Sequence, residues 1–166
     1  MKMLIKLNNL DIKLLVLDVD GVLTNGKLYS SDNGMETKSF HIHDGMGLKL
    51  LLKHNIIIVV ISGRKSQATK KRMRELGIKH VYLGIDNKLQ IFNRFKKQFG
   101  LKKENIACVG DDLPDIPLMK QAGFSIAVAN ATHQVQKVAD YITKNKGGQG
   151  AVREVCDLIL QVQEYD

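Results

Sequence analysis

The stretch Leu15-Val16-Leu17-Asp18-Val19-Asp20-Gly21-Val22-Leu23-Thr24 carries two aspartates, one residue apart, from an apolar run into a glycine turn. Such a run is typical of a strand buried in a parallel sheet, and the carboxyl ends of these strands form the ligand crevice of open α/β sheets. If the strand reaches Asp20, both carboxylates point to the same side. Because buried carboxylates are costly unless a cation or a reaction uses them, the pair predicts a functional site. Either both hold a metal, or one attacks an electrophile while the other moves a proton.

Apolar runs alternate with amphipathic segments along the rest of the chain. This order predicts an α/β fold, a three-layer Rossmann-like parallel sheet with helices on both faces. The expected strands are 14–19, 56–62, 80–85, 105–110, 124–129 and 141–143. The expected helices are 45–54, 65–76, 87–99, 113–122, 132–138 and 150–163. Since 166 residues with 44% hydrophobic content suit one core, we expect a single domain over 1–166.

Residues 27–41 interrupt this alternation. They predict a β-hairpin that turns at Asp32-Asn33-Gly34. The segment follows the aspartate pair directly, so we expect the hairpin to overhang the same crevice.

The composition narrows the class of protein. There is no apolar stretch long enough to cross a membrane, and the N-terminus is too interrupted for a signal peptide. Cys108 and Cys156 lie in apolar segments, which favours two free thiols in a reducing cytoplasm. The net charge of +8 comes from dispersed basic residues. The densest basic run, 70–74, has no aromatic partners, which favours a solvated helix face over a nucleic-acid site. A further explanation of the positive charge is that it steers a small anionic substrate to the site.

Further polar segments follow expected strands or open expected helices. Ser62-Gly63-Arg64 offers a hydroxyl and free amides to an anion, although serines there often only cap a helix. Lys88 opens a helix, where an ordinary lysine would be solvated. Gly110-Asp111-Asp112-Leu113-Pro114-Asp115 brings more carboxylates to a strand end, two of which could be helix caps. Together these groups suit Mg²⁺ and a phosphoryl group, and an aspartate nucleophile with a carboxyl acid/base can transfer that group.

In this order the segments resemble the four motifs of the haloacid dehalogenase superfamily. The resemblance implies that Asp18 is the nucleophile and a metal ligand. It makes Asp20 the general acid/base, which also gives its backbone carbonyl to Mg²⁺, and Asp111 the other metal ligand. Ser62 and Lys88 would hold the phosphoryl group, with Asp112 and Asp115 in support. The retained Asp20 favours a phosphatase over a dehalogenase.

The chain has little room for the cap domain that covers the site in many members of the superfamily. Only the hairpin and one helix lie between Thr24 and Ser62, and one helix and one strand lie between Lys88 and Gly110. We therefore expect a capless enzyme whose open site is completed by a macromolecular substrate or by a neighbouring subunit, and we predict a homo-oligomer.

Two further segments, Phe40 to Lys49 and Gly147 to Glu154, resemble the 3-deoxy-D-manno-octulosonate 8-phosphate (KDO 8-phosphate) phosphatases of lipopolysaccharide biosynthesis. The resemblance implies a Mg²⁺-dependent homotetramer in which the glycine-rich C-terminal tail, 147–166, approaches a neighbouring active site. It also implies substrate contacts from a larger set of residues: Asp20, His41, Ile42, His43, Asp44, Gly45, Lys49, Arg64, Arg72 and Lys88. Arg64 and Arg72, eight residues apart, would lie near one helix face and suit a carboxylate.

Four alternatives stay open. The same motifs would serve a phosphatase of a nine-carbon sialic or deaminated sialic acid 9-phosphate. A nucleic-acid 3′-phosphatase would fit the charge, but the aromatic platforms are missing. A binding domain without turnover is disfavoured by the intact catalytic groups. His41 and His43 could share a strand face as zinc ligands, but no third soft ligand is near in sequence, which favours Mg²⁺.

Overall fold

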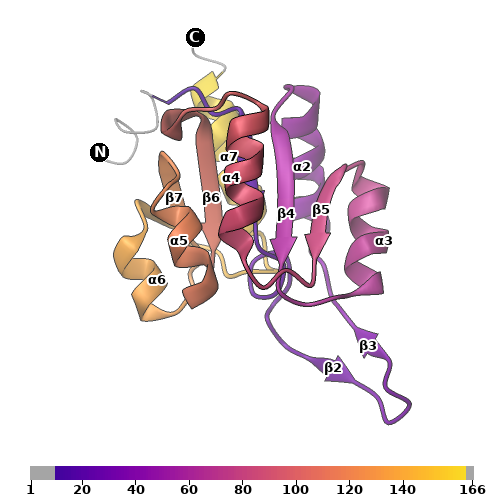
Figure 1. Cartoon of the computed structure of the whole chain (residues 1–166). Helices are drawn as coiled ribbons and strands as arrows, with labels where there is room; N and C mark the ends of the chain where they lie inside the picture. The colour runs from indigo at the N-terminus through magenta and orange to yellow at the C-terminus, as the bar shows by residue number, and fades with distance from the viewer. Residues whose placement is uncertain (1–9, 164–166) are drawn as a thin grey trace.

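The computed structural model describes residues 10–163 and places β1 (Leu14–Leu17) in the middle of a six-stranded parallel sheet. The strand order is β5-β4-β1-β6-β7-β8 (Figure 1). The other sheet strands are β4 (Ile57–Ser62), β5 (His80–Leu83), β6 (Ile106–Gly110), β7 (Phe124–Ala127) and β8 (Tyr141–Ile142). The predicted α/β fold and all six predicted strands are confirmed, each within two residues. The predicted domain limits, 1 and 166, and the signal-peptide prediction lie outside the described residues.

The strand register explains why the polar segments meet. Leu17, the last residue of β1, pairs with Val60 of β4 and with Val109 of β6. All four residues of β1 are buried, as expected for a strand covered on both faces. The carboxyl ends of these three strands therefore lie nearly level, and Asp18, Ser62 and Gly110 come to the same edge of the sheet.

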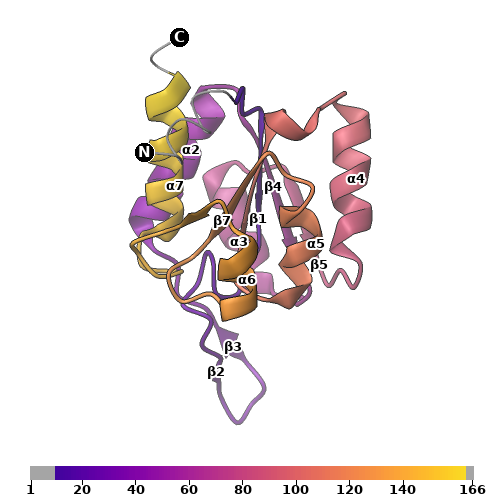
Figure 2. The ribbon, with the colours of Figure 1, turned by 90° about the vertical axis from the view of Figure 1, so that its left-hand side faces the viewer.

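Helices cover both faces of the sheet. Helices α2 (Ile42–Lys53) and α7 (Ala151–Gln163) pack together on one side, and α4 (Lys88–Gln98) and α5 (Ile116–Met119) lie on the other (Figure 2). A Cβ at Gly47 would lie 3.0 Å from both Arg153 Cδ and Cys156 Cβ, so the close approach of α2 and α7 requires a residue without one. The remaining helical segments are α3 (Gln67–Leu76), η1 (Lys103–Asn105), η2 (Leu113–Asp115) and α6 (His133–Val138).

The predicted hairpin is present and projects from the carboxyl end of the sheet (Figure 1). Its antiparallel strands, β2 (Tyr29–Ser30) and β3 (Glu36–Thr37), are only two residues long each. The turn closes through a hydrogen bond from the amide of Gly34 to the carbonyl of Ser31, 2.8 Å long.

One helix and one strand differ from the sequence predictions. The helix predicted at 113–122 is instead η2 followed by the short α5, because Pro117 has no amide to donate to Leu113 and so breaks a continuous helix. Strand β1 ends at Leu17 rather than Val19, since the amides of Leu23 and Thr24 bend back to the carbonyl of Val19. The alternation that would have put Asp18 and Asp20 on one strand face therefore does not apply.

The helix predicted at 45–54 begins earlier, at Ile42. Cys108 and Cys156 are buried free thiols, as predicted. Among the helices of residues 10–163, none has the length and apolar character needed to span a membrane.

Candidate active site

A pocket of about 490 Å³ lies at the carboxyl end of the sheet, where the predicted motif residues meet. Its walls come from the loops after β1, β4, β5 and β6. The structure thus brings together residues that are as much as 97 positions apart in the sequence (18 to 115). Among those lining the pocket are Asp18, Asp20, Ser62, Arg64, Lys88, Asp111, Asp112 and Asp115.

Lys88 lies between two carboxylates in this pocket. Its Nζ is 2.5 Å from Asp18 Oδ1 and 2.8 Å from Asp115 Oδ1, and all three side chains are buried. Asn87 fixes the start of α4 by accepting a hydrogen bond from the amide of Gln90, and this places Lys88 in the first turn. Burial alone would lower the pKa of Lys88, but the two carboxylates raise it above its ordinary value, so Lys88 stays charged.

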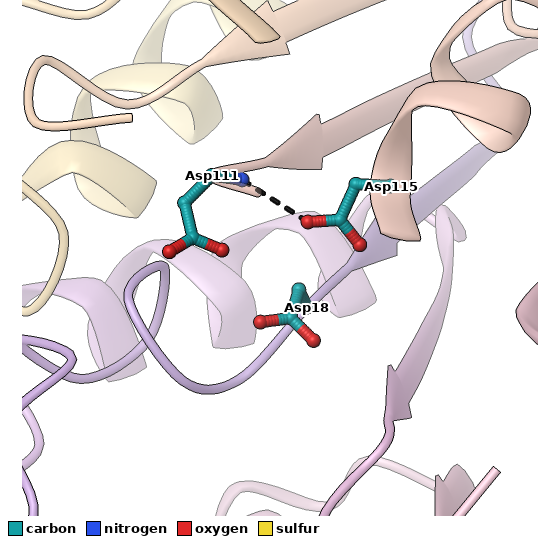
Figure 3. Close-up of side chains that lie close together, drawn as sticks. All are labelled: Asp18, Asp111 and Asp115. Carbon is teal, nitrogen blue, oxygen red and sulfur yellow. Dashed lines mark hydrogen bonds between the residues drawn. The ribbon is translucent and has the colours of Figure 1, made fainter. Parts of the chain in front are cut away.

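Asp18, Asp111 and Asp115 face one another at the ends of β1 and β6 (Figure 3). One carboxylate oxygen from each lies within 4.8 Å of the others. Burial, together with the charge of Asp115, raises the pKa of Asp18 to about 6, and Lys88 opposes this rise. Burial and the neighbouring Asp18 and Asp115 raise the pKa of Asp111 to about 8. Three carboxylates thus surround one ammonium in a buried site, an arrangement that a bound cation would stabilise in its ionised form.

Both carboxylate oxygens of Asp115 already accept hydrogen bonds within the chain. Its Oδ1 accepts from Lys88, and its Oδ2 accepts from the backbone amides of Asp111 and Asp112, 3.1 Å and 3.4 Å away. Asp112 caps η2 through the amide of Leu113. Asp18 and Asp111 thus remain as the carboxylates able to hold Mg²⁺, while Asp115 orients Lys88 and the loop after β6.

Gly21 allows Asp111 to approach the loop that carries Asp18 and Asp20. Its φ is +96°, and a Cβ there would lie 1.9 Å from Asp111 Oδ2. The glycine-rich segment packs on the same loop from within the chain. The amide of Gly148 donates to the carbonyl of Val22, and a Cβ at Gly147 would lie 1.6 Å from the carbonyl oxygen of Gly21.

The base of the hairpin reaches the pocket. Lys38 forms an ion pair with Asp20, and Arg64 Nη2 lies 2.5 Å from Glu36 Oε2. Ser62 is buried, and its Oγ accepts a hydrogen bond from the amide of Arg64. The expectation that Arg64 and Arg72 share a helix face is wrong, because α3 begins at Gln67 and Arg64 lies in the loop before it.

Several predicted substrate contacts lie elsewhere in the single chain. His41 and His43 line a second pocket of about 610 Å³, with Arg153 and Glu154, and this pocket shares no lining residue with the first. Within the chain, Asp44 is 2% exposed and its Oδ1 accepts from the amide of Arg153 in the first turn of α7. Its side chain therefore fastens α7 to α2.

The other predicted contacts outside the pocket lie on α2 and α3, namely Ile42, Gly45, Lys49 and Arg72. A Cβ at Gly45 would lie 2.5 Å from Arg72 Nη2, so Gly45 makes room for Arg72. Arg72 also pairs with Glu75 at 3.6 Å. Ile42 is exposed, as is Lys49. None of these residues lines the pocket around Asp18.

Comparisons with known proteins agree with this geometry. A family model described as haloacid dehalogenase-like hydrolase matches residues 84–155. The 3-deoxy-D-manno-octulosonate 8-phosphate phosphatase of Salmonella typhi is 47% identical over 153 residues, covering 92% of this chain and 81% of that protein. The chain belongs to the KDO 8-phosphate phosphatase family. The resemblance read from the sequence motifs is thereby confirmed.

Solved structures of this phosphatase family have the same fold. The Moraxella catarrhalis KDO 8-phosphate phosphatase, in complex with magnesium, phosphate and KDO, superposes with a TM-score of 0.93 at 43% identity and covers 98% of this chain and 92% of that one. A cobalt-bound family member from Haemophilus influenzae gives a TM-score of 0.89 at 42% identity, covering 96% and 92%.

Sequence reasoning missed Lys38 and Glu36. Both lie on the predicted hairpin. The only sequence signal that they could reach the site was the position of the hairpin directly after the aspartate pair. Charged residues are common on exposed hairpins, so their sequence alone does not reveal that Lys38 is buried against Asp20.

Proposed function

We propose that this chain hydrolyses KDO 8-phosphate to the free sugar acid and phosphate, through a phosphoryl group carried on Asp18. The proposal rests on the buried Lys88, which lies between Asp18 and Asp115 and beside Asp111. It is supported by the identity of 43–47% between this chain and phosphatases of this name. The enzyme would serve lipopolysaccharide biosynthesis.

The first half-reaction moves the phosphoryl group to the protein. An Asp18 carboxylate oxygen attacks phosphorus, a new O–P bond forms, and the P–O bond to C8 of the sugar breaks. Asp20 gives its proton to the departing sugar oxygen. Lys88 holds Asp18 in place, and Ser62 Oγ with the loop 62–64 binds the phosphoryl oxygens.

The second half-reaction restores the enzyme. Asp20, now a carboxylate, takes a proton from a water molecule whose oxygen attacks phosphorus. The bond between phosphorus and Asp18 breaks, and inorganic phosphate leaves. Asp18 returns as a carboxylate and Asp20 as an acid.

The residues present fit a Mg²⁺ ion. Asp18 and Asp111 would hold it, with the backbone carbonyl of Asp20 as the third protein ligand implied by the family resemblance. When bound, Mg²⁺ neutralises charge on the phosphoryl oxygens and on the crowded carboxylates. The geometry supports this assignment, because Asp18, Asp111 and Asp115 place three carboxylates beside the single ammonium of Lys88. Burial, with the neighbouring carboxylates, raises the pKa values of Asp18 and Asp111, and a bound cation would oppose both effects.

We also propose a homotetramer in which a neighbouring subunit completes the site. Two observations support it. Residues 41–45, Lys49 and Arg72 lie outside the pocket around Asp18, so substrate contact from them requires another copy. Large apolar side chains on the hairpin and α2 are exposed, namely Leu28, Tyr29, Met35, Ile42 and Met46. The tail from Gly147 would approach that neighbouring site, and the free thiols of Cys108 and Cys156 support a cytoplasmic setting.

The test is Mg²⁺-dependent phosphate release across KDO 8-phosphate, nine-carbon sugar-acid 9-phosphates and 3′-phosphorylated oligonucleotides. The proposal expects the highest kcat/KM on KDO 8-phosphate. A higher value on a nine-carbon substrate or on an oligonucleotide would replace it with the corresponding alternative.

A further inference from the structure

Lys38 is a buried cation at the base of the hairpin. Its side chain is 3% exposed, and its Nζ forms an ion pair with Asp20 Oδ1. The same nitrogen lies 3.6 Å from Glu36 Oε1. Burying a lysine side chain costs hydration and rotamer entropy, so the contact with Asp20 is a specific feature of the site.

The ion pair belongs to a longer series of alternating charges. Glu36 joins Lys38 to Arg64, whose Nη2 is 2.5 Å from Glu36 Oε2. The hydrogen bond and charge of Arg64, with the charge of Lys38, hold the pKa of Glu36 below its ordinary value, so Glu36 stays negative. The series Asp20–Lys38–Glu36–Arg64 therefore links the loop after β1, the hairpin and the loop after β4.

The two oxygens of Asp20 have different surroundings. Lys38 holds Oδ1, whereas Oδ2 is buried and has no hydrogen-bond partner among the described residues. Asp20 also lines the pocket that contains Asp18. An unpaired buried carboxylate oxygen is costly unless a ligand or a reaction supplies its partner.

We propose that Lys38 is a positioning residue that holds Oδ1 of Asp20, so that Oδ2 exchanges the proton with the sugar oxygen and the attacking water. The inference rests on the proposed function, since it assigns Asp20 the role of acid and base there. Glu36 and Arg64 keep Lys38 in place. Lys38 itself touches no reacting atom.

Two substrates with different leaving groups distinguish a positioning role of Lys38 from a purely structural one. The sugar leaves as a primary alkoxide, which needs a proton as the P–O bond breaks. p-Nitrophenolate is a stable anion and leaves without one. Asp20 also serves the second half-reaction, which is the same for both substrates, so the comparison uses kcat/KM, which reports the steps up to release of the alcohol. Loss of the correct Asp20 orientation therefore lowers kcat/KM for the sugar phosphate and leaves kcat/KM for the aryl phosphate nearly unaffected, whereas general damage to the site lowers both.

The experiment measures kcat/KM for KDO 8-phosphate and for p-nitrophenyl phosphate with the Mg²⁺-loaded enzyme. Lys38→Met should lower kcat/KM for the sugar phosphate by about 10- to 100-fold, part of the 10²–10⁴-fold contribution of a positioned acid. Its kcat/KM for the aryl phosphate should change less than about 3-fold. Lys38→Gln keeps a hydrogen-bond donor and should retain more activity on the sugar phosphate, and it serves as the test if Lys38→Met does not fold.

Lys27→Met is the matched control, because Lys27 is exposed on the same hairpin and forms no ion pair within residues 10–163. Both of its rates should equal those of the wild type. In the Asp20→Asn background, adding Lys38→Met should cost little further on the sugar phosphate, because the proton transfer is already lost.

Equal losses on both substrates, or no loss on either, would overturn the positioning role. If the wild-type enzyme does not cleave KDO 8-phosphate, the proposed function fails instead. The same comparison then applies to a simple alkyl phosphate in place of the sugar, so the two failures are distinguishable.

Discussion

Lys88 Nζ lies 2.5 Å from Asp18 Oδ1, although 70 residues separate the two in the sequence. The contact sets the proposed nucleophile beside a fixed positive charge, at a buried position where water screens little. Because Asp115 holds the same ammonium from the other side, Lys88 neutralises two carboxylates at once.

Lys88→Met leaves Asp18 and Asp115 buried without their cation. Breaking such a buried pair costs about 3–5 kcal/mol of the free energy of unfolding. We also expect kcat to fall by about 10²-fold or more, since the charge that stabilises the phosphoryl group in the transition state is lost. Urea unfolding of the metal-free protein and phosphate-release kinetics with saturating Mg²⁺ measure the two effects.

Lys97→Met is the control on the same helix, because Lys97 is exposed. Its free energy of unfolding should stay within about 0.5 kcal/mol of the wild type, with unchanged kcat. An equally stable and fully active Lys88→Met protein would contradict the role given to Lys88.

The pKa of Asp111 predicts how stability responds to pH without metal. It is about 8 in the folded protein and lies near 3.9 in an unfolded chain. Between these values the folded protein binds the proton more tightly, so its stability is greatest at low pH in this range and falls as the pH rises toward 8. Thermal unfolding of the metal-free protein between pH 5 and 9 measures the decline.

Mg²⁺ should reverse that decline, because it binds the ionised carboxylates. We expect the Mg²⁺-induced rise in Tm to grow with pH over the same range. Asp111→Asn should flatten the pH dependence and remove most of the Mg²⁺ effect. A Tm of the metal-free wild type that rises toward pH 8 would contradict the assignment.

Gly21→Ala should weaken Mg²⁺ binding and activity. The added Cβ would lie 1.9 Å from Asp111 Oδ2, so either Asp111 or the loop carrying Asp20 must shift. Gly100→Ala is the matched control, because Gly100 also has a positive φ, +60°, but a Cβ there meets nothing within 4 Å.

Both substitutions carry the left-handed backbone cost of about 1–2 kcal/mol. Only Gly21→Ala should raise the Mg²⁺ concentration required for half-maximal activity, by about 10-fold or more. Equal Mg²⁺ titrations for the two variants would show that the close approach at Gly21 has no bearing on the metal.

The proposed tetramer predicts a mass in light scattering of four times the chain mass of 18.6 kDa. Leu28→Glu combined with Met35→Glu places charges on the exposed apolar surface of the hairpin and should dissociate the assembly. KM for KDO 8-phosphate should rise in the dissociated protein, because the neighbouring subunit no longer contributes to the site. A monomeric wild-type protein with full activity would exclude a shared site.

The sequence predicted the sheet well, because fully buried parallel strands appear as continuous apolar runs. It also predicted which strand ends carry the site, since parallel register aligns those ends, as with Leu17, Val60 and Val109. The helix predicted at 113–122 is present as two shorter helical segments, η2 and α5, because Pro117 has no amide with which to continue a single helix.

The contacts of the site were harder to predict. Lys38 reaches Asp20 only because a hairpin turns back over the loop, and no residue spacing encodes that path. His41, His43 and Arg72 came from the family resemblance, and one chain alone does not bring them to Asp18. In the proposed tetramer, their contact with the substrate would depend on a neighbouring subunit, which the pattern of a single sequence does not specify.

In the proposed reaction, Asp18 carries the phosphoryl group during hydrolysis of KDO 8-phosphate. The most direct measurement is rapid acid quenching of the Mg²⁺-loaded enzyme with KDO 8-phosphate labelled in its phosphate, followed by peptide mapping. We predict label on the peptide that contains Asp18, at a level that rises within the first turnover, and none in Asp18→Asn. Turnover of the substrate with no label on Asp18, or with label on another residue, would rule out Asp18 as the nucleophile.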